Sequence, residues 1–296
     1  MTIEPSPATA GRRGPPPTLL AVAAIVSVQF GNALAGTTFA EVGALGAASL
    51  RLLFAAIILL VVLRPSVRGW TRRVWVGVVA LGVGLAGMNG LIYLAIERVP
   101  IGVAVAVELL GPLSVAIVGT RRPRDLLWVA LAGLGVGMLA LDSQGTVAIA
   151  GILLAAGAAA FWALYILASA RLGATSVRGV DGLAIAMVVA AVIVVPFGAG
   201  SATAAVVRDP VLLAVFAGIA LMTSALPYAL EFIALKTMPT RVFGVLSSLG
   251  PVVAALAGLV VLGQVLSPLQ LAAIAIIIAA SAGAVASAQR PHSGRG

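Results

Sequence analysis

The chain of 296 residues contains no cysteine, a single histidine and few charges. Without cysteine it has no disulfides, no thiol catalysis and no cysteine-ligated metal sites. The histidine, His292, lies in a polar tail, which excludes histidine-based metal or acid–base chemistry within apolar segments. The chain has no cluster of His, Asp and Glu of the kind a membrane-embedded enzyme needs. We therefore predict no cofactor, no metal and no enzymatic activity.

Long apolar runs dominate the chain, which is 61% hydrophobic and only 9% charged. Each run has about 16 to 24 residues, roughly what a helix needs to cross a 30 Å hydrocarbon core. This pattern predicts an all-α integral membrane protein with ten transmembrane helices. The runs cover 19–39, 42–63, 74–95, 101–119, 126–141, 148–169, 183–199, 211–234, 242–262 and 268–287.

Basic residues sort between the two sides of the membrane when these runs are taken as spans. With the N-terminus inside, fifteen of the eighteen Lys and Arg residues are cytoplasmic, Arg98 and Arg208 lie outside, and Arg51 is within a span. Positive residues stay cytoplasmic during insertion, so both termini are predicted to be cytoplasmic. The net charge of +9 is scattered over short loops. It therefore indicates contact with the lipid bilayer and no nucleic acid.

The N-terminal region has some features of a secretory signal. Arg12 and Arg13 precede an apolar run that ends in Ala33-Leu34-Ala35, a small-residue pattern typical of cleavage sites. The run is longer than a signal core and has an equivalent at 148–169, so we expect an uncleaved first span. Residues 1–17 and 288–296 are predicted to be disordered cytoplasmic tails.

An internal repeat divides the chain into five-helix halves, 18–142 and 143–287. A shift of 139 positions places Pro100 and Gly111-Pro112 on Pro239 and Gly250-Pro251. Because each half has an odd number of spans, the halves insert in opposite senses. Inverted repeats with a site at their interface are typical of secondary transporters that work by alternating access. A passive channel is the structural alternative.

Three prolines are expected to break helices within the membrane: Pro112, Pro251 and Pro227. Proline cannot donate to the carbonyl four residues earlier, and its ring pushes that turn apart. The freed carbonyls belong to Glu108, Ser247 and Thr223, respectively. Protein, water or a ligand must satisfy them. They therefore indicate either a polar cavity or kinks satisfied by a neighbouring helix.

Ionisable residues within the spans are few, and they are candidates for substrate binding or ion coupling. They are Arg51, Glu108 and Glu231. A charge near mid-membrane costs at least about 2.5–3.5 kcal/mol on insertion scales, so it should face a cavity or a partner. The alternative is a pair between Arg51 and a carboxylate that only locks helices together.

Polar and aromatic side chains accompany these groups at helical spacing. Residues three or four apart share one face of a helix. The pairs are Gln29 and Asn32, Asn89 and Tyr93, Trp162 and Tyr165, and Tyr228 and Glu231. Ser169 continues the face of Trp162 and Tyr165. Gly133, Gly135 and Gly137 predict close helix packing.

Several motifs resemble those of the EamA-type transporters of the drug/metabolite transporter superfamily, most closely its threonine/homoserine-exporting branch. The likeness covers nearly all of 19–287. The first half carries Gly87-Met88-Asn89, Tyr93-Leu94-Ala95-Ile96, Val99-Pro100 and Gly111-Pro112-Leu113. The second carries Ala225-Leu226-Pro227-Tyr228, Leu230-Glu231 and Pro239-Thr240-Arg241.

The resemblance implies efflux of small neutral amino acids from a bacterial cytoplasm, in exchange for protons. The chain departs from the family pattern at Leu249-Gly250-Pro251, where relatives often carry an acid before the proline, and at Gly263-Gln264, where a Gly-Glu is common. These departures shift the coupling role toward Glu108 and Glu231.

The resulting hypothesis is proton-coupled export of a small zwitterion. Glu108 is expected to hold the ammonium group and to carry the proton, with Glu231 as second choice. Arg51, Asn89 or Tyr228 is expected to hold the carboxylate. The alternative is efflux of drugs or other metabolites by the same fold.

Overall fold

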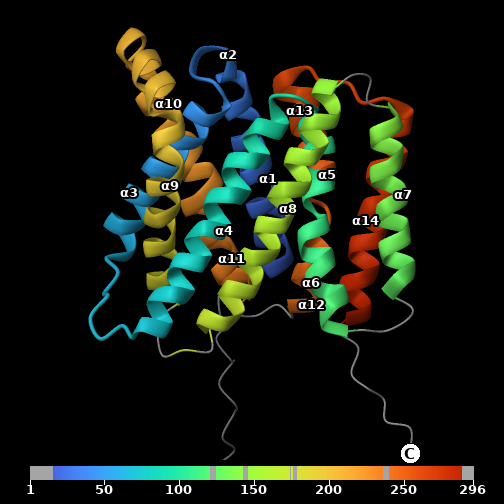
Figure 1. Cartoon of the computed structure of the whole chain (residues 1–296), viewed down its shortest axis with the longest axis horizontal. Coiled ribbons are helices and arrows are strands. Elements are labelled where there is room, and N and C mark those ends of the chain that lie inside the picture. The colour runs from blue at the N-terminus through green and yellow to red at the C-terminus, as the bar shows by residue number, and fades with distance from the viewer. Residues whose placement is uncertain are drawn as a thin grey trace, which may run out of the picture.

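A computed structural model describes residues 16–120, 125–142, 146–173, 175, 179–235 and 240–288. Within these ranges the chain is helical and has no strand. The helices run side by side, so that their ends gather at two opposite sides of the molecule (Figure 1). They are α1 (Pro17–Thr37), α2 (Phe39–Val42), α3 (Ala44–Leu63), α4 (Arg72–Ile96), α5 (Ile101–Glu108), α6 (Leu110–Thr120), α7 (Asp125–Asp142), α8 (Thr146–Gly173), α9 (Gly179–Arg208), α10 (Val211–Ala220), the π-helix η1 (Leu221–Ala225), α11 (Leu226–Leu235), α12 (Thr240–Ser247), α13 (Gly250–Leu262) and α14 (Pro268–Ala288).

Prolines and glycines set several helix boundaries. Pro100 precedes α5, and Pro268 is the first residue of α14, where a missing N–H and a fixed φ suit the first turn. At the other end of a helix, Gly263 takes a φ of 65° after α13. Its neighbour Gln264 donates its backbone N–H to the carbonyl of Gly258 at 3.0 Å, which caps the last turn.

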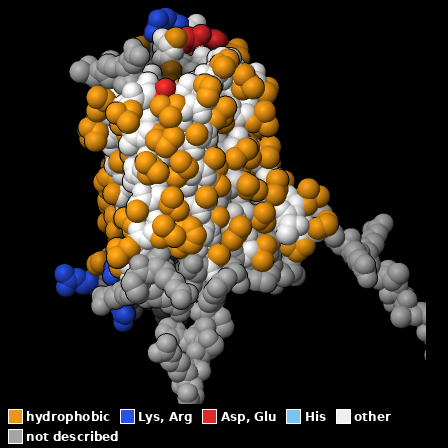
Figure 2. All heavy atoms as spheres, turned by 90° about the vertical axis from the view of Figure 1, so that its right-hand side faces the viewer, with side chains coloured by type: hydrophobic (Ala, Val, Ile, Leu, Met, Phe, Trp, Pro, Cys, Tyr) orange, Lys and Arg blue, Asp and Glu red, His pale blue; other side chains and the backbone are white. Residues whose placement is uncertain are grey.

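Eight helical stretches of the described chain are long and apolar enough to cross a membrane. Two shorter apolar stretches accompany them, Ile101–Val115 and Leu126–Asp142. Figure 2 shows hydrophobic side chains spread over the middle of one face, with Lys and Arg near both ends and Asp and Glu near the upper end. The chain is therefore a multi-pass membrane protein. The sequence runs at 101–119, 126–141, 211–234 and 242–262 correspond to helices that are short, interrupted or both.

α4 lies at the centre of the helix packing and contacts α8 and α9. A Cβ at Gly84 would lie 3.1 Å from the Cα of Tyr165 in α8, and one at Gly82 would lie 2.5 Å from the Cβ of Val189 in α9. Small residues allow such close backbone approach between membrane helices. Further contacts join α3 to α9, α7 to α14, α1 to α11 and α13, and α5 to α13.

The glycine prediction for α7 is confirmed at one position and wrong at two. A Cβ at Gly135 would lie 2.6 Å from Ile277 in α14, whereas those at Gly133 and Gly137 would meet nothing within 4 Å. Residues advance by 100° around a helix, so a spacing of two turns Gly135 away from the other two. Only its face meets α14.

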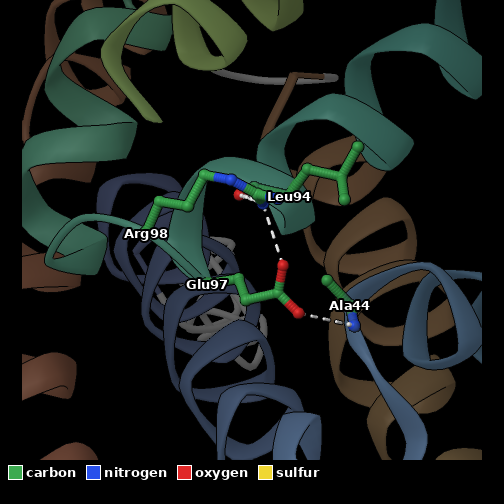
Figure 3. A network of polar contacts seen from close by, with 4 residues as sticks. All are labelled: Ala44, Leu94, Glu97 and Arg98. Atoms are coloured by element: carbon green, nitrogen blue, oxygen red, sulfur yellow. Dashed lines mark hydrogen bonds and ion pairs between the residues drawn. The ribbon is translucent and has the colours of Figure 1, made fainter. Parts of the chain in front are cut away.

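One end of the bundle carries a polar network that joins α3 to the end of α4. Glu97 accepts a hydrogen bond from the backbone N–H of Ala44, the first residue of α3, at 3.4 Å (Figure 3). The same carboxylate forms an ion pair of 2.8 Å with Arg98, which also donates to the carbonyl of Leu94 (Figure 3). The network fixes the turn between α4 and α5 against α3.

Candidate functional site

The cation of Arg51 is buried between α3 and α4, with 4% of its surface exposed. Its Nη2 donates a hydrogen bond to Oδ1 of Asn89, and its Cζ lies 5.2 Å from the centroid of the Tyr93 ring. Asn89 and Tyr93 follow each other by one turn of α4, as their spacing predicted. An amide and an aromatic face thus surround the guanidinium, and the ring contributes a cation–π interaction.

The expected alternative, a salt bridge between Arg51 and a carboxylate, is not formed among the described residues. Its Nε is buried and has no hydrogen-bond partner within the same part of the chain. The charge of Arg51 nevertheless acts on Glu108 and Tyr228. Arg51 thus retains an unused donor, and its charge acts on a nearby carboxyl group.

Two polar side chains of α1 extend this cluster. The hydroxyl of Tyr93 donates to Oδ1 of Asn32 at 3.4 Å, and Asn89 donates its own amide N–H to the carbonyl of Leu85 at 2.7 Å. Gln29 lies one turn before Asn32 and is also buried. Since Asn32, Arg51 and Asn89 come from α1, α3 and α4, the cluster joins three helices.

Glu108 lies at an interruption of the fourth apolar run. It is the last residue of α5, and α6 begins at Leu110, just before Pro112. The side chains of 101–107 are all buried, whereas Glu108 is partly exposed. The carboxyl group of Glu108 therefore stands at the point where the helix is interrupted.

The ninth run is interrupted at the matching place. α12 ends at Ser247 and α13 begins at Gly250, so Pro251 occupies the first turn of the new helix. The hydroxyl of Ser247 donates to the carbonyl of Phe243 at 2.9 Å. Both Gly-Pro pairs of the repeat therefore stand at the start of a second helical segment.

Pro227 is preceded by a different kind of interruption. The π-helix η1 ends two residues before it, and the backbone N–H of Leu226 donates to the carbonyl of Leu221, five residues earlier. A π-helix inserts an extra residue into a helix, often at a functional site. The proline was the sequence signal here, but the type of interruption was not predicted.

A second group of side chains gathers between α8 and α11. The hydroxyl groups of Tyr165 and Ser169 are hydrogen-bonded, and the charge of Glu231 acts on Tyr165 and Tyr228. All of these side chains, and Trp162, are partly exposed. Because Tyr228 is within electrostatic range of both Arg51 and Glu231, it connects the two groups.

Three further polar residues were not predicted as members of a site. Ser27 in α1 donates to the carbonyl of Met222 in η1 at 2.6 Å. Gln264 accepts a hydrogen bond of 3.0 Å from the backbone N–H of Ile101 at the start of α5. Asp181 in the first turn of α9 is buried, and its Oδ1 has no partner among the described residues. Of the three, only Gln264 stands out in the sequence, because it departs from the family pattern.

Similarity to known proteins agrees with this arrangement. The chain is 43% identical over 269 residues to the threonine/homoserine exporter RhtA of Escherichia coli strain K12, a match that spans 90% of each protein. Residues 149–286 match the EamA-like transporter family. The chain belongs to this family. It is also 41% identical over 276 residues to the protein of the same description from Salmonella typhimurium strain LT2, across 93% of this chain and 92% of the relative. EamA-like proteins are transporters and not enzymes, as the sequence predicted.

Proposed function

We propose that this EamA-like protein exports small neutral amino acids, of the threonine and homoserine kind, in exchange for protons by alternating access. The observation that carries the substrate class is the 43% identity to an amino-acid exporter over 90% of both chains. A zwitterion needs donors for its carboxylate and an acceptor for its ammonium group. Arg51 with Asn89 offers the first, and Glu108 offers the second.

The helix contacts support ten spans arranged as two inverted repeats. In the first half the spans are α1, α3, α4, α5 with α6, and α7. In the second they are α8, α9, α10 through α11, α12 with α13, and α14. If each helix is replaced by its counterpart in the other half, the contact of α1 with α11 becomes a contact of α8 with α4. In the same way the contact of α1 with α13 becomes a contact of α8 with α6. All four contacts are present in the structure. The family match over 149–286 coincides with one half. Such exchangeable packing is typical of transporters that work by alternating access.

Charges at the helix ends support cytoplasmic termini in a bacterial cytoplasmic membrane. Arg64, Arg68 and Arg72 lie at the connection between α3 and α4, on the side where α1 begins and α14 ends (Figure 1). The opposite side carries the ion pair of Glu97 and Arg98, in which the negative charge balances the positive one. This is the distribution expected if the basic side is cytoplasmic.

Transport in this scheme links the two carboxyl groups to the cargo. Glu108 holds the ammonium group when ionised and releases it on protonation, since a neutral carboxyl no longer attracts the cation. Arg51 stays charged throughout and holds the carboxylate. Glu231, closer to the cytoplasmic end, passes protons between Glu108 and the cytoplasm.

The test uses purified protein in proteoliposomes preloaded with radiolabelled threonine or homoserine. We expect efflux that depends on an imposed proton gradient and that Glu108→Gln abolishes. Gradient-driven efflux that survives in Glu108→Gln would refute the coupling role of Glu108. No efflux from folded, inserted protein would refute the substrate class and favour drugs or other metabolites as cargo.

A further inference from the structure

Gln29 is a buried amide with an unused acceptor. Its side chain lies in α1 with 9% of its surface exposed, and its Oε1 has no hydrogen-bond partner within the described chain. Its neighbour on the same face, Asn32, uses its oxygen to accept from Tyr93. Buried amide oxygens are normally hydrogen-bonded, so an unpaired one calls for an explanation.

The position of Gln29 is tied to the broken helix of the second half. A Cβ added to Gly250, the first residue of α13, would lie 3.7 Å from Nε2 of Gln29 and 3.9 Å from Cγ1 of Val105. The amide therefore stands where α1, α5 and α13 meet. α5 and α13 belong to the two interrupted spans.

An aromatic residue lies beside the other Gly-Pro break, that of the first half. Gly111, the mate of Gly250, lies against α8, where an added Cβ would be 2.4 Å from the carbonyl oxygen of Ala159 and 3.1 Å from the Cβ of Trp162. α8 is the counterpart of α1. Each Gly-Pro break thus packs on the first helix of the other half, beside Gln29 on one side and Trp162 on the other.

We propose that Gln29 is the specificity-determining residue for the side-chain hydroxyl of the transported amino acid. Its Oε1, buried and unpaired within the described chain, accepts the hydroxyl hydrogen of the bound substrate. The inference rests on the proposed function and narrows its cargo to short hydroxylated amino acids. Gln29 is enclosed in this conformation, and separation of α1 from α13 during alternating access exposes it.

A site built to hydrogen-bond a hydroxyl group rejects the analogue that lacks it, because the buried polar atom is then left unpaired. 2-Aminobutyrate is the deoxy analogue of both threonine and homoserine, and so isolates this one group. Because this oxygen has no partner within the described chain, its removal also distinguishes a role in binding from a role in stability. Replacing Gln29 by an apolar side chain removes an unsatisfied acceptor and should not destabilise the fold.

The experiment compares threonine and 2-aminobutyrate as competitors of labelled threonine in proteoliposomes of full-length protein. Wild-type protein should prefer threonine by about tenfold or more. Gln29→Met and Gln29→Leu should bring this ratio close to one while the thermal unfolding midpoint stays unchanged or rises. Ser27→Ala, on the same helix, should keep the wild-type ratio, because its hydroxyl is already engaged with Met222.

Two results would overturn the inference. A wild-type ratio retained by an active Gln29→Met or Gln29→Leu protein would show that Gln29 does not read the hydroxyl. A lowered midpoint with equal loss for both competitors would assign it a structural role. If wild-type protein transports no amino acid, the proposed function itself is wrong, which is a distinct outcome of the same assay.

Discussion

The side-chain oxygen of Gln264 accepts a hydrogen bond of 3.0 Å from the backbone N–H of Ile101, 163 residues away. The bond ties the first turn of α5 to the connection between α13 and α14, at the end of the bundle that we place outside. It thus joins segments that are far apart in the sequence, next to the interrupted helices α5 and α13. An outward-open state must loosen this contact.

Gln264→Ala should therefore favour the outward-open state by about two- to tenfold, the effect of losing one hydrogen bond. The chain has no cysteine, so a single Val105→Cys reports access to the space between α5 and α13. We expect an impermeant maleimide added outside to label Val105→Cys faster in the Gln264→Ala background.

Two variants control this measurement. Gln264→Glu keeps the acceptor for Ile101 and should label at the parent rate. Gln270→Ala removes an acceptor that serves the N–H of Ser267 at the start of α14, outside α5, so it should leave labelling unchanged. Equal labelling of the Gln264→Ala and Gln270→Ala proteins would exclude Gln264 as a gating contact.

Arg51 and Asn89 should be energetically coupled. Arg51→Lys keeps the charge but not the planar fork that reaches Asn89 while it lies over Tyr93. We expect a raised apparent KM for amino-acid efflux in Arg51→Lys. In a double-mutant cycle of Arg51→Met and Asn89→Leu, the coupling in unfolding free energy should be about 0.5–3 kcal/mol. Additive effects, with an unchanged KM for Arg51→Lys, would leave Arg51 without a role in binding.

Local periodicity accounts for what the sequence could predict of this cluster. Asn89 and Tyr93 are one turn apart, so helix geometry alone places both on one face. The same reasoning grouped Gln29 with Asn32. In each case the prediction needed only the 100° step of one helix.

The partner of Arg51 was not predictable in this way. Asn89 lies 38 residues along the chain, and which side chain meets the guanidinium depends on how α3 packs on α4. The same holds for Ile101 and Gln264. The π-helix at Leu221–Ala225 was also not predicted. Pro227 indicates that the helix is interrupted, but it does not indicate whether the helix kinks or takes up an extra residue.

The ion pair between Glu97 and Arg98 should contribute little to stability. Both side chains are about one-third exposed, and such pairs are worth roughly 0–1 kcal/mol. Arg98→Ala should therefore lower the unfolding free energy by less than about 1 kcal/mol, and less still in high salt. Glu97→Ala should cost more, because it removes the acceptor for the N–H of Ala44 and so a contact between α3 and α4, whereas the bond from Arg98 to Leu94 is local to the end of α4. Thermal unfolding of both variants in low and high salt measures these losses. A larger loss for Arg98→Ala than for Glu97→Ala would contradict the prediction.

The two glycines of the repeated Gly-Pro pair should respond differently to alanine. At Gly111 an added Cβ would lie 2.4 Å from the carbonyl oxygen of Ala159, which forces α6 away from α8 and should cost about 1–3 kcal/mol. At Gly250 the nearest atoms are 3.7 and 3.9 Å away, an ordinary contact. Alanine also loses less backbone entropy on folding, so Gly250→Ala should be neutral or stabilising by up to about 1 kcal/mol.

Unfolding midpoints of Gly111→Ala and Gly250→Ala measure this difference directly, each protein serving as the control for the other. Equal losses would mean that both breaks are packed alike. A loss confined to Gly111→Ala would identify the first break as held tightly against α8 and the second as the one with space around it. Since Gln29 borders that second break, the amide that we assign to substrate recognition would then lie beside the looser helix. It is at this helix that an opening motion would meet the least steric resistance.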